Sequence, residues 1–167
     1  GPMNFNFSIS LKISVVILSL YTVKNFNYNT ASGLIIASHS MPSFVFETVM
    51  SAEDKVQFII RAKNAGFFIR LFFISTENPK INAARIADRV MKGGHDVPIT
   101  KIISRYYKSI ENCKTVSSFV DRLYVYDNSI DGEEAKLQFR LVDGAVAKMY
   151  VTDVPEWAQA ILPDTDF

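Results

Sequence analysis

The nine residues 67–75, FFIRLFFIS, constrain the fold more than any other stretch of this sequence. Seven of the nine are large and apolar. A run this short and this apolar is typical of a strand that is buried on both faces, as in a parallel sheet. Gly66 before the run suits the C-terminal cap of a helix, and Asn78-Pro79 after it suits the start of another helix. The run is therefore predicted to be a central strand between two helices.

Strand and helix patterns alternate on both sides of this run. Such alternation is typical of βαβ units built around a parallel sheet. We therefore predict a three-layer α/β fold, in which a mostly parallel sheet has helices on both faces and ends in a C-terminal β-hairpin around Asp143-Gly144. The predicted strands are residues 13–23, 43–48, 67–75, 122–126, 136–142 and 146–152, and the predicted helices are residues 31–39, 51–65, 79–91, 99–113 and 155–162.

The composition fits one folded domain. The chain has 167 residues, 49% of them hydrophobic, which is enough for a core and excludes a disordered tail. The net charge is +1, so overall charge gives no reason to expect a nucleic-acid or membrane partner, and we predict neither. The single cysteine, Cys113, cannot form an internal disulfide. That fits a reducing compartment, and we expect a cytoplasmic protein.

Residues 1–30 form an atypical N-terminal segment. Gly1-Pro2 resembles the remnant of a cleaved purification tag. Residues 13–23, ISVVILSLYTV, supply about half of the roughly 20 residues that a membrane-spanning helix requires. Lys12 precedes the run, as in a signal peptide, but no suitable cleavage site follows it. The density of Ile, Val, Ser and Thr favours a buried strand over a signal peptide or an anchor.

Residues 80–108 form a basic segment. It holds seven Lys or Arg residues and two Asp residues, a net charge of +5 in a chain of net charge +1. Arg85 and Arg89 are four residues apart and share one helix face, and Lys101 and Arg105 share a face of the next helix. Guanidinium groups bind phosphate oxygens through paired hydrogen bonds and offset their charge.

Gly93-Gly94 separates the two basic helices and offers the flexibility that the hinge of a lid needs. This hinge supports a phosphate-binding lid, while a solvated surface with ordinary ion pairs is the alternative interpretation. His95 follows the glycines and is expected to be exposed. It has no ligand partner at a suitable spacing, so we predict no metal site.

Three other features could carry chemistry. Glu47 follows a predicted strand and would lie at the carboxyl edge of a parallel sheet, where ligands bind in open α/β folds. There it could orient a substrate hydroxyl or the water shell of Mg²⁺, with a turn or capping carboxylate as the alternative. Cys113 has no histidine near it in the sequence that would mark it as a nucleophile, so a buried structural thiol is expected. The aromatic residues of 67–73 are assigned to the core and not to a base-stacking platform, because Arg70 is the only base among them.

Three groups of residues carry a family resemblance. The first is FVFET at residues 44–48 with AKNAGF at 62–67 and RLFF at 70–73. The second and most specific is NAARIADRV at residues 82–90, with GGHDVP at 93–98 and IISRY at 102–106. The third is YVYDNS at residues 124–129. Together they resemble the zeta-toxin-like kinases, also described as predicted P-loop ATPases, over about residues 31–151. Residues 31–167 would then be the C-terminal portion of such a kinase domain.

The resemblance implies a P-loop kinase fold and an enzyme that phosphorylates UDP-N-acetylglucosamine with ATP and Mg²⁺. It makes Glu47 a catalytic carboxylate at the substrate edge, with Thr48 beside it, and it makes Arg89 and Arg105 catalytic lid residues. The residues expected at the ATP phosphates are Arg85, Arg89, His95, Lys101 and Arg105.

The chain departs from this family near its N-terminus. The phosphate loop of the family, G-x-x-x-x-G-K-[ST], is absent from the sequence. No aspartate precedes Asp54, so the substrate base of the family also has no counterpart. The apolar run within residues 13–23 could serve as a replacement strand.

Three functional hypotheses follow. The chain is a small-molecule kinase that works only when the missing part is supplied elsewhere, a pseudoenzyme that binds a nucleotide, nucleotide-sugar or protein partner of the antitoxin type, or an inactive remnant that folds. Sheet surface without its N-terminal unit would be exposed, so we also predict self-association through residues 13–23.

Overall fold

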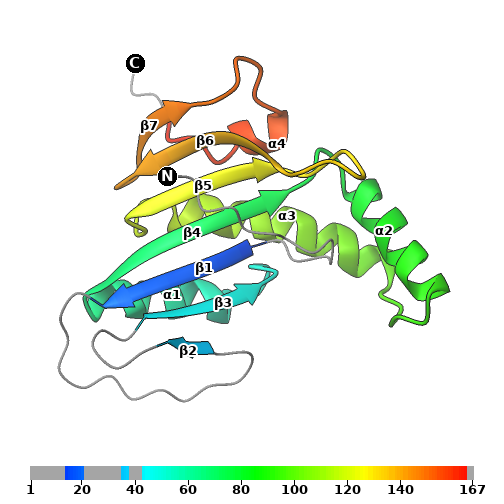
Figure 1. Cartoon of the computed structure of the whole chain (residues 1–167), viewed down its shortest axis with the longest axis horizontal. Helices are drawn as coiled ribbons and strands as arrows, with labels where there is room; N and C mark the ends of the chain where they lie inside the picture. The colour runs from blue at the N-terminus through cyan, green and yellow to red at the C-terminus, as the bar shows by residue number, and fades with distance from the viewer. Residues whose placement is uncertain (1–13, 21–34, 38–42, 165–167) are drawn as a thin grey trace.

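The computed structural model describes residues 14–20, 35–37 and 43–164. In that part of the chain, seven strands form one sheet in the order β2-β3-β1-β4-β5-β6-β7 (Figure 1). The strands are β1 (Ser14–Leu20), β2 (Ile35–Ala37), β3 (Ser43–Thr48), β4 (Phe67–Ser75), β5 (Arg122–Asp127), β6 (Lys136–Val142) and β7 (Ala145–Met149). The helices are α1 (Glu53–Asn64), α2 (Pro79–Met91), α3 (Ile99–Val116) and α4 (Glu156–Gln159).

The sheet is mixed, and the prediction of a mostly parallel sheet is wrong. Among the described strands, β4 and β5 are the only parallel neighbours. Two features account for three of the five antiparallel pairs among these strands. The short turn at Asp143-Gly144 joins β6 to β7 and forces an antiparallel pair, as a hairpin must. The strand β1 lies between β3 and β4 and runs antiparallel to both. Consequently β3, β4 and β5 share one direction, and their carboxyl ends lie at one edge of the sheet.

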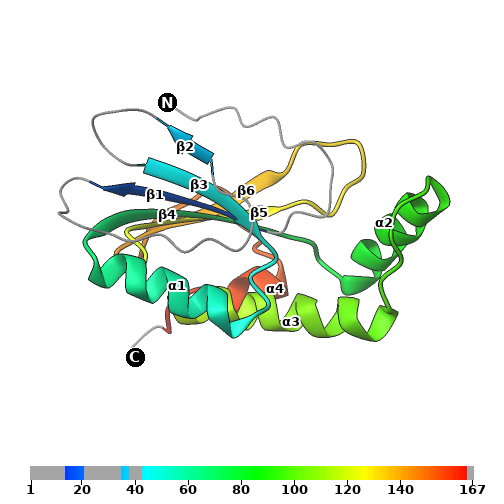
Figure 2. The same cartoon turned by 90° about the horizontal axis from the view of Figure 1, so that it is seen from below.

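The helices α1, α3 and α4 all cover the same face of the sheet (Figure 2). The expectation of three layers, with helices on both faces, therefore fails for the described residues, which form a sheet with one helical layer. The remaining helix, α2, projects beyond the carboxyl end of β4 and contacts α3 (Figures 1 and 2). The coarser prediction of an α/β fold, with a sheet flanked by helices and a C-terminal hairpin, is confirmed.

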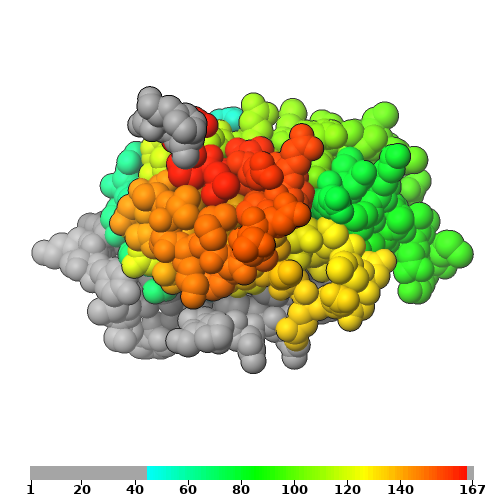
Figure 3. All heavy atoms as spheres, turned by 90° about the horizontal axis from the view of Figure 1, so that it is seen from above, coloured from blue at the N-terminus to red at the C-terminus, as the bar shows by residue number. Residues whose placement is uncertain are grey.

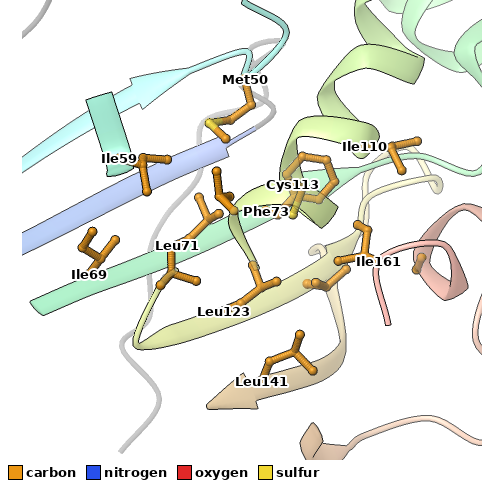
Figure 4. Packing of buried hydrophobic residues seen from close by; sticks show 14 of the residues in the cluster. Met50, Ile59, Ile69, Leu71, Phe73, Ile110, Cys113, Leu123, Leu141 and Ile161 are labelled. Atoms are coloured by element: carbon orange, nitrogen blue, oxygen red, sulfur yellow. The ribbon is translucent and has the colours of Figure 1, made fainter. Parts of the chain in front are cut away.

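The core lies between β4 and the helical layer. Phe67, Ile69, Leu71 and Phe73 alternate along β4 and are 0–1% exposed. They pack against apolar residues of α1, α3, β5 and β6, which include Ile59, Ile110, Cys113, Leu123 and Leu141 (Figure 4). The residues between them, Phe68 and Arg70, point to the other face and are only half-buried. The two faces of β4 therefore differ, although Phe72 and Ile74 near its end are buried as well.

Local signals placed most elements correctly. Asn78 caps α2 by accepting a hydrogen bond from the Lys80 amide at 2.9 Å, with Pro79 at the first helical position. The predicted helix at 31–39 is wrong where the structure describes it, because Ile35–Ala37 is a strand that pairs with β3. The rest of that predicted helix lies outside the described residues. The predicted strand at 13–23 is confirmed over Ser14–Leu20.

Candidate functional site

A strained turn leads from β3 into α1. Met50 has a positive φ of 58°, which is unusual for a residue with a side chain, and it is completely buried. Two hydrogen bonds hold this conformation: Thr48 Oγ1 accepts from the Met50 amide at 3.3 Å, and Asn112 Nδ2 of α3 donates to the Met50 carbonyl at 2.7 Å. Because the contact with Asn112 joins the turn to α3, the amino end of α1 is fixed beside that helix.

The amino ends of α1 and α3 lack side-chain caps. The residue before α1 is Ala52 and the residue before α3 is Pro98, and neither supplies a capping hydrogen bond. The helix predicted from residue 51 begins at Glu53, so Ser51 is not its capping residue. The first amides of an uncapped helix need another acceptor, and they carry the positive end of the helix dipole. These ends therefore favour an anion.

An open cleft of about 480 Å³ lies where α1 begins and α3 passes it. We call it the α1–α3 cleft. Lys101, Arg105 and Lys108 supply three positive charges, and Glu53 supplies one negative charge. None of the three cations forms an ion pair with a described residue, whereas the Glu53 carboxylate accepts a hydrogen bond from Gln57 at 3.0 Å. The residues that line the cleft are Ser51, Ala52, Glu53, Thr100, Lys101, Ser104, Arg105 and Lys108.

The inner face of α3 is anchored to the rest of the domain. Tyr106 is buried, and its hydroxyl donates a hydrogen bond to the Thr76 carbonyl, just after β4, at 2.8 Å. Burial raises the pKa of Tyr106 above its ordinary value of 10.0. Ile110 and Cys113 continue this face into the core. Because one face of α3 is fixed in this way, Lys101, Arg105 and Lys108 are left on its outer surface.

The arginines of α2 lie in a different environment. Arg85 forms an ion pair with Asp131, with 2.6 Å between Nη2 and Oδ1, and the loop that follows β5 lies against α2 (Figure 3). Arg89 donates from Nη2 to the His95 carbonyl at 3.3 Å. The arginines of α2 therefore bind groups of the protein itself and are not gathered with Lys101 and Arg105, as the predicted phosphate-binding lid requires. Lys101 and Arg105 face the amino end of α1, and no residue of α2 lines the α1–α3 cleft.

The glycine turn is built around Arg89. Gly93 has a positive φ of 91°, and the Gly94 amide donates to the Arg89 carbonyl at 2.9 Å. His95 is exposed, as expected, and its carbonyl is the group that binds Arg89. In this structure the Gly93-Gly94 pair closes a tight turn after α2, with the arginine side chain folded back over it.

Glu47 and Thr48 lie at the end of β3, outside the residues that line the cleft. Phe46 packs edge to face on Phe58 of α1, with ring centroids 5.2 Å apart, so its side chain is on the helical side. Side chains alternate along a strand, and Glu47 consequently lies on the opposite face, where it is exposed. The structure therefore does not bring Glu47 into the α1–α3 cleft with Lys101 and Arg105.

Cys113, metal ligands and membrane spans complete the comparison of the structure with the sequence predictions. Cys113 is a free, fully buried cysteine, as expected, and burial raises the pKa of its thiol well above 9.0. Among the described residues, no three His, Cys, Asp or Glu side chains are grouped so that they could hold a metal ion. No described helix is long and apolar enough to cross a membrane.

Several cleft residues were not singled out from the sequence. Thr100, Ser104 and Lys108 recur at intervals of four residues beside Lys101 and Arg105. The helix face predicted from Lys101 and Arg105 could therefore have been extended to include them. Ser51 and Glu53 belong to another element, and nothing in the sequence indicates that α1 begins beside α3.

Comparisons with known proteins give little support for any identity. No family model and no solved structure matches the chain. Over 63 residues the chain is 35% identical to an uncharacterized protein of Haemophilus influenzae. The match covers 38% of this chain and 45% of the relative, so the chain spans less than half of that protein's length. The resemblance to the zeta-toxin-like kinases consequently stays a prediction.

Proposed function

We propose that the chain is a binding domain for a phosphorylated small molecule, of zeta-toxin-like kinase ancestry, that does not transfer phosphate by itself. The ligand is a nucleotide or nucleotide-sugar whose polyphosphate occupies the α1–α3 cleft. The observation that carries this proposal is the set of three cations, without ion pairs among the described residues, beside the uncapped amino end of α1.

The cleft has the chemistry that a polyphosphate requires. Arg105 can offer a planar fork of donors, and Lys101 and Lys108 add point charges on either side of it in the sequence. Helix amino ends bind anions through free amides and the helix dipole. The volume of about 480 Å³ lies within the range of small-molecule sites. The Ser51, Thr100 and Ser104 hydroxyls can donate further hydrogen bonds to phosphate oxygens.

Two observations argue against turnover by this chain. The sequence contains no G-x-x-x-x-G-K-[ST] loop, whose amides and lysine fix the β- and γ-phosphates. The strand β1 also cannot lead a loop to the cleft edge, because it runs against β3, β4 and β5 and its carboxyl end lies at the opposite edge of the sheet. Loss of a single preorganised donor of this kind typically slows a reaction by about 10²- to 10³-fold. Loss of the whole loop should reduce transfer to background.

The test measures binding and turnover separately. Titration calorimetry with ATP, pyrophosphate and UDP-N-acetylglucosamine should detect binding that weakens as salt is added. Lys101→Ala and Arg105→Ala should each weaken it by about 10-fold, since a hydrogen bond to a charged group contributes about 1.5–3 kcal/mol before solvent screening. Lys80→Ala is the matched control, because Lys80 is exposed on α2 and does not line the cleft.

Phosphate transfer from ATP to UDP-N-acetylglucosamine is assayed with Mg²⁺ against a buffer blank. Background transfer together with binding supports the proposal. Clear transfer that is lost on Glu47→Ala would overturn the claim of inactivity and support the kinase hypothesis. Absence of binding for all three ligands would overturn the proposed function.

A further inference from the structure

The face of the sheet that lies opposite α1 and α3 carries aromatic and basic residues in rows. One row crosses four strands, because Phe72 pairs with Tyr124, Tyr124 with Arg140, and Arg140 with Lys148. Residues that pair directly across strands share a face of the sheet. This row therefore contains a buried ring, Phe72, and a half-buried ring, Tyr124, followed by two cations.

A second row contains Arg70 and Arg122, which pair across β4 and β5. Both guanidinium groups lie over the ring of Phe68, at 4.9 Å and 5.6 Å from its centroid. In the first row the rings of Phe72 and Tyr124 are stacked, 4.7 Å apart and nearly parallel at 6°. On β7, Lys148 lies 4.8 Å from the ring centroid of Tyr150, which follows that strand. We call this surface the aromatic–basic face.

The charge of the aromatic–basic face is not balanced by nearby acids. Arg70, Arg122, Arg140 and Lys148 form no ion pair with a described residue. The Arg140 Nε is buried and has no hydrogen-bond partner. The acid in the same row is Glu47, which is separated from Phe72 by β1 and hence by about 10 Å. Residues 1–46 contain no Asp or Glu, so that part of the chain cannot neutralise these cations.

This charge selects the class of partner. A second copy of the same face would bring four cations against four cations, which disfavours a self-complementary dimer through this surface. An anion without flat rings would satisfy the cations but would not use the aromatic side chains. Single-stranded nucleic acid supplies both a phosphate backbone and bases that stack on aromatic rings.

We propose that the aromatic–basic face binds single-stranded nucleic acid, independently of the α1–α3 cleft. The accessible end is at β7, where Lys148 is exposed and Tyr150 keeps 41% of its surface exposed. Tyr124 and Tyr126 are half-buried and extend the ring surface inward. The sequence predicted no nucleic-acid partner because the net charge is only +1, and it predicted no base-stacking platform because Arg70 is the only base within 67–73. Strand pairing adds the other three cations from β5, β6 and β7.

The test uses fluorescence anisotropy with labelled oligo-uridylate and oligo-thymidylate of about 20 nucleotides, which exceeds the site size of one small domain. Both should bind, and affinity should fall with salt at a logarithmic slope of up to about −3, since each phosphate contact on a single strand contributes about −0.7. Tighter binding of the uridylate would add a 2′-hydroxyl contact, and equal affinities would assign recognition to phosphates and bases alone. Either result supports the proposal.

The decisive variant is Lys148→Ala/Tyr150→Ala, which changes two exposed side chains. It should weaken binding by about 5- to 100-fold, because loss of one stacked base contact has that effect. Lys80→Ala/Tyr107→Ala removes the same two residue types from exposed positions on α2 and α3 and should leave affinity unchanged. Circular dichroism checks that both variants fold.

Three results would overturn the proposal. The first is the absence of binding to either oligomer at low salt. The second is an equal loss of affinity in the variant and in its control. The third is binding of inorganic polyphosphate that is as tight as binding of the oligomers. The last result would show that charge alone accounts for the affinity. Excess ATP should not displace the oligomer, and displacement would place the nucleic acid in the α1–α3 cleft instead.

Discussion

The two basic helices, α2 and α3, carry the same spacing of cations but use them differently. Arg85 and Arg89 of α2 bind groups of the protein itself, the Asp131 carboxylate and the His95 carbonyl. Lys101 and Arg105 of α3 have the same four-residue spacing and form no ion pair with a described residue. The same spacing of cations can therefore stabilise the fold in one helix and leave the cations available to a ligand in the next.

The difference lies in what surrounds each helix. The loop after β5 and the turn after α2 place an acceptor within reach of each arginine of α2. On α3, Tyr106 and Asn112 anchor the helix to Thr76 and Met50, and the cations lie outside these contacts. Beside them lies the amino end of α1, where the helix dipole is positive and Glu53 adds one negative charge to the cleft. The three cations exceed this single acid, so the α1–α3 cleft keeps a net positive charge that an anion can bind.

The largest effect on stability should come from the turn that holds Arg89. A Cβ atom on Gly94 would lie 2.8 Å from Arg89 Cγ and 2.9 Å from the Arg89 carbonyl oxygen. The backbone oxygen cannot move without opening the turn, so Gly94→Ala should lower the free energy of unfolding by about 1–3 kcal/mol. Denaturant unfolding measures this change.

Gly93→Ala is the control for that substitution. A Cβ at Gly93 meets nothing within 4 Å, and its cost comes only from the positive φ of 91°, about 1 kcal/mol. Equal losses of stability for Gly94→Ala and Gly93→Ala would show that the close contact between Gly94 and Arg89 does not constrain this turn. Neither substitution should change affinity at the α1–α3 cleft, which α2 does not line.

A smaller effect should come from the anchor of α3. Tyr106→Phe removes the hydrogen bond to the Thr76 carbonyl and should lower the free energy of unfolding by about 1 kcal/mol at neutral pH. The pKa of Tyr106 is raised in the folded protein, so its neutral form stabilises the fold below pH 10.0. That contribution is lost as the pH rises above 10.0 towards the raised pKa.

The wild-type protein should therefore lose stability more steeply than Tyr106→Phe above pH 10.0. Tyr126 and Cys113, whose pKa values are also raised by burial, are present in both proteins and cancel in the difference. Unfolding curves measured across this pH range give the slope of the free energy of unfolding against pH for each protein. Parallel slopes would show that the Tyr106 hydroxyl is not buried in solution.

Sequence patterns predicted the features that depend on neighbours along the chain. Asn78-Pro79 begins α2 because a capping side chain and a proline act within one helical turn. Gly66, with a φ of 88°, follows α1 because only glycine adopts that conformation at little cost. The hairpin turn at Asp143-Gly144 has positive φ at both residues, which the Asp-Gly pair favours.

Features that depend on distant parts of the chain were not predictable in the same way. The direction of β1 follows from its pairing with β3 and β4, and its apolar composition is equally compatible with either direction. The run at 67–75 was expected to be buried on both faces, but Phe68 and Arg70 are half-buried on the face opposite α1 and α3. The α1–α3 cleft joins residues about fifty positions apart, so only its α3 side could be anticipated, from Lys101 and Arg105.

The smallest effect separates a guanidinium fork from a simple charge. Arg105→Lys keeps the charge in the α1–α3 cleft but loses the paired donors, so affinity for pyrophosphate should fall by about 3- to 10-fold, less than for Arg105→Ala. Its free energy of unfolding should stay within about 0.5 kcal/mol of wild type, because Arg105 is exposed.

Arg85→Lys is the matched substitution on α2. It should weaken the contact with Asp131, whose side chain is 79% exposed, and lower stability by less than about 1 kcal/mol without any change in affinity. Calorimetric titration gives the affinity of each variant for pyrophosphate, and denaturant unfolding gives its free energy of unfolding. If Arg85→Lys lowers the affinity for pyrophosphate as much as Arg105→Lys does, the two helices share one site, and the distinction drawn between them is wrong.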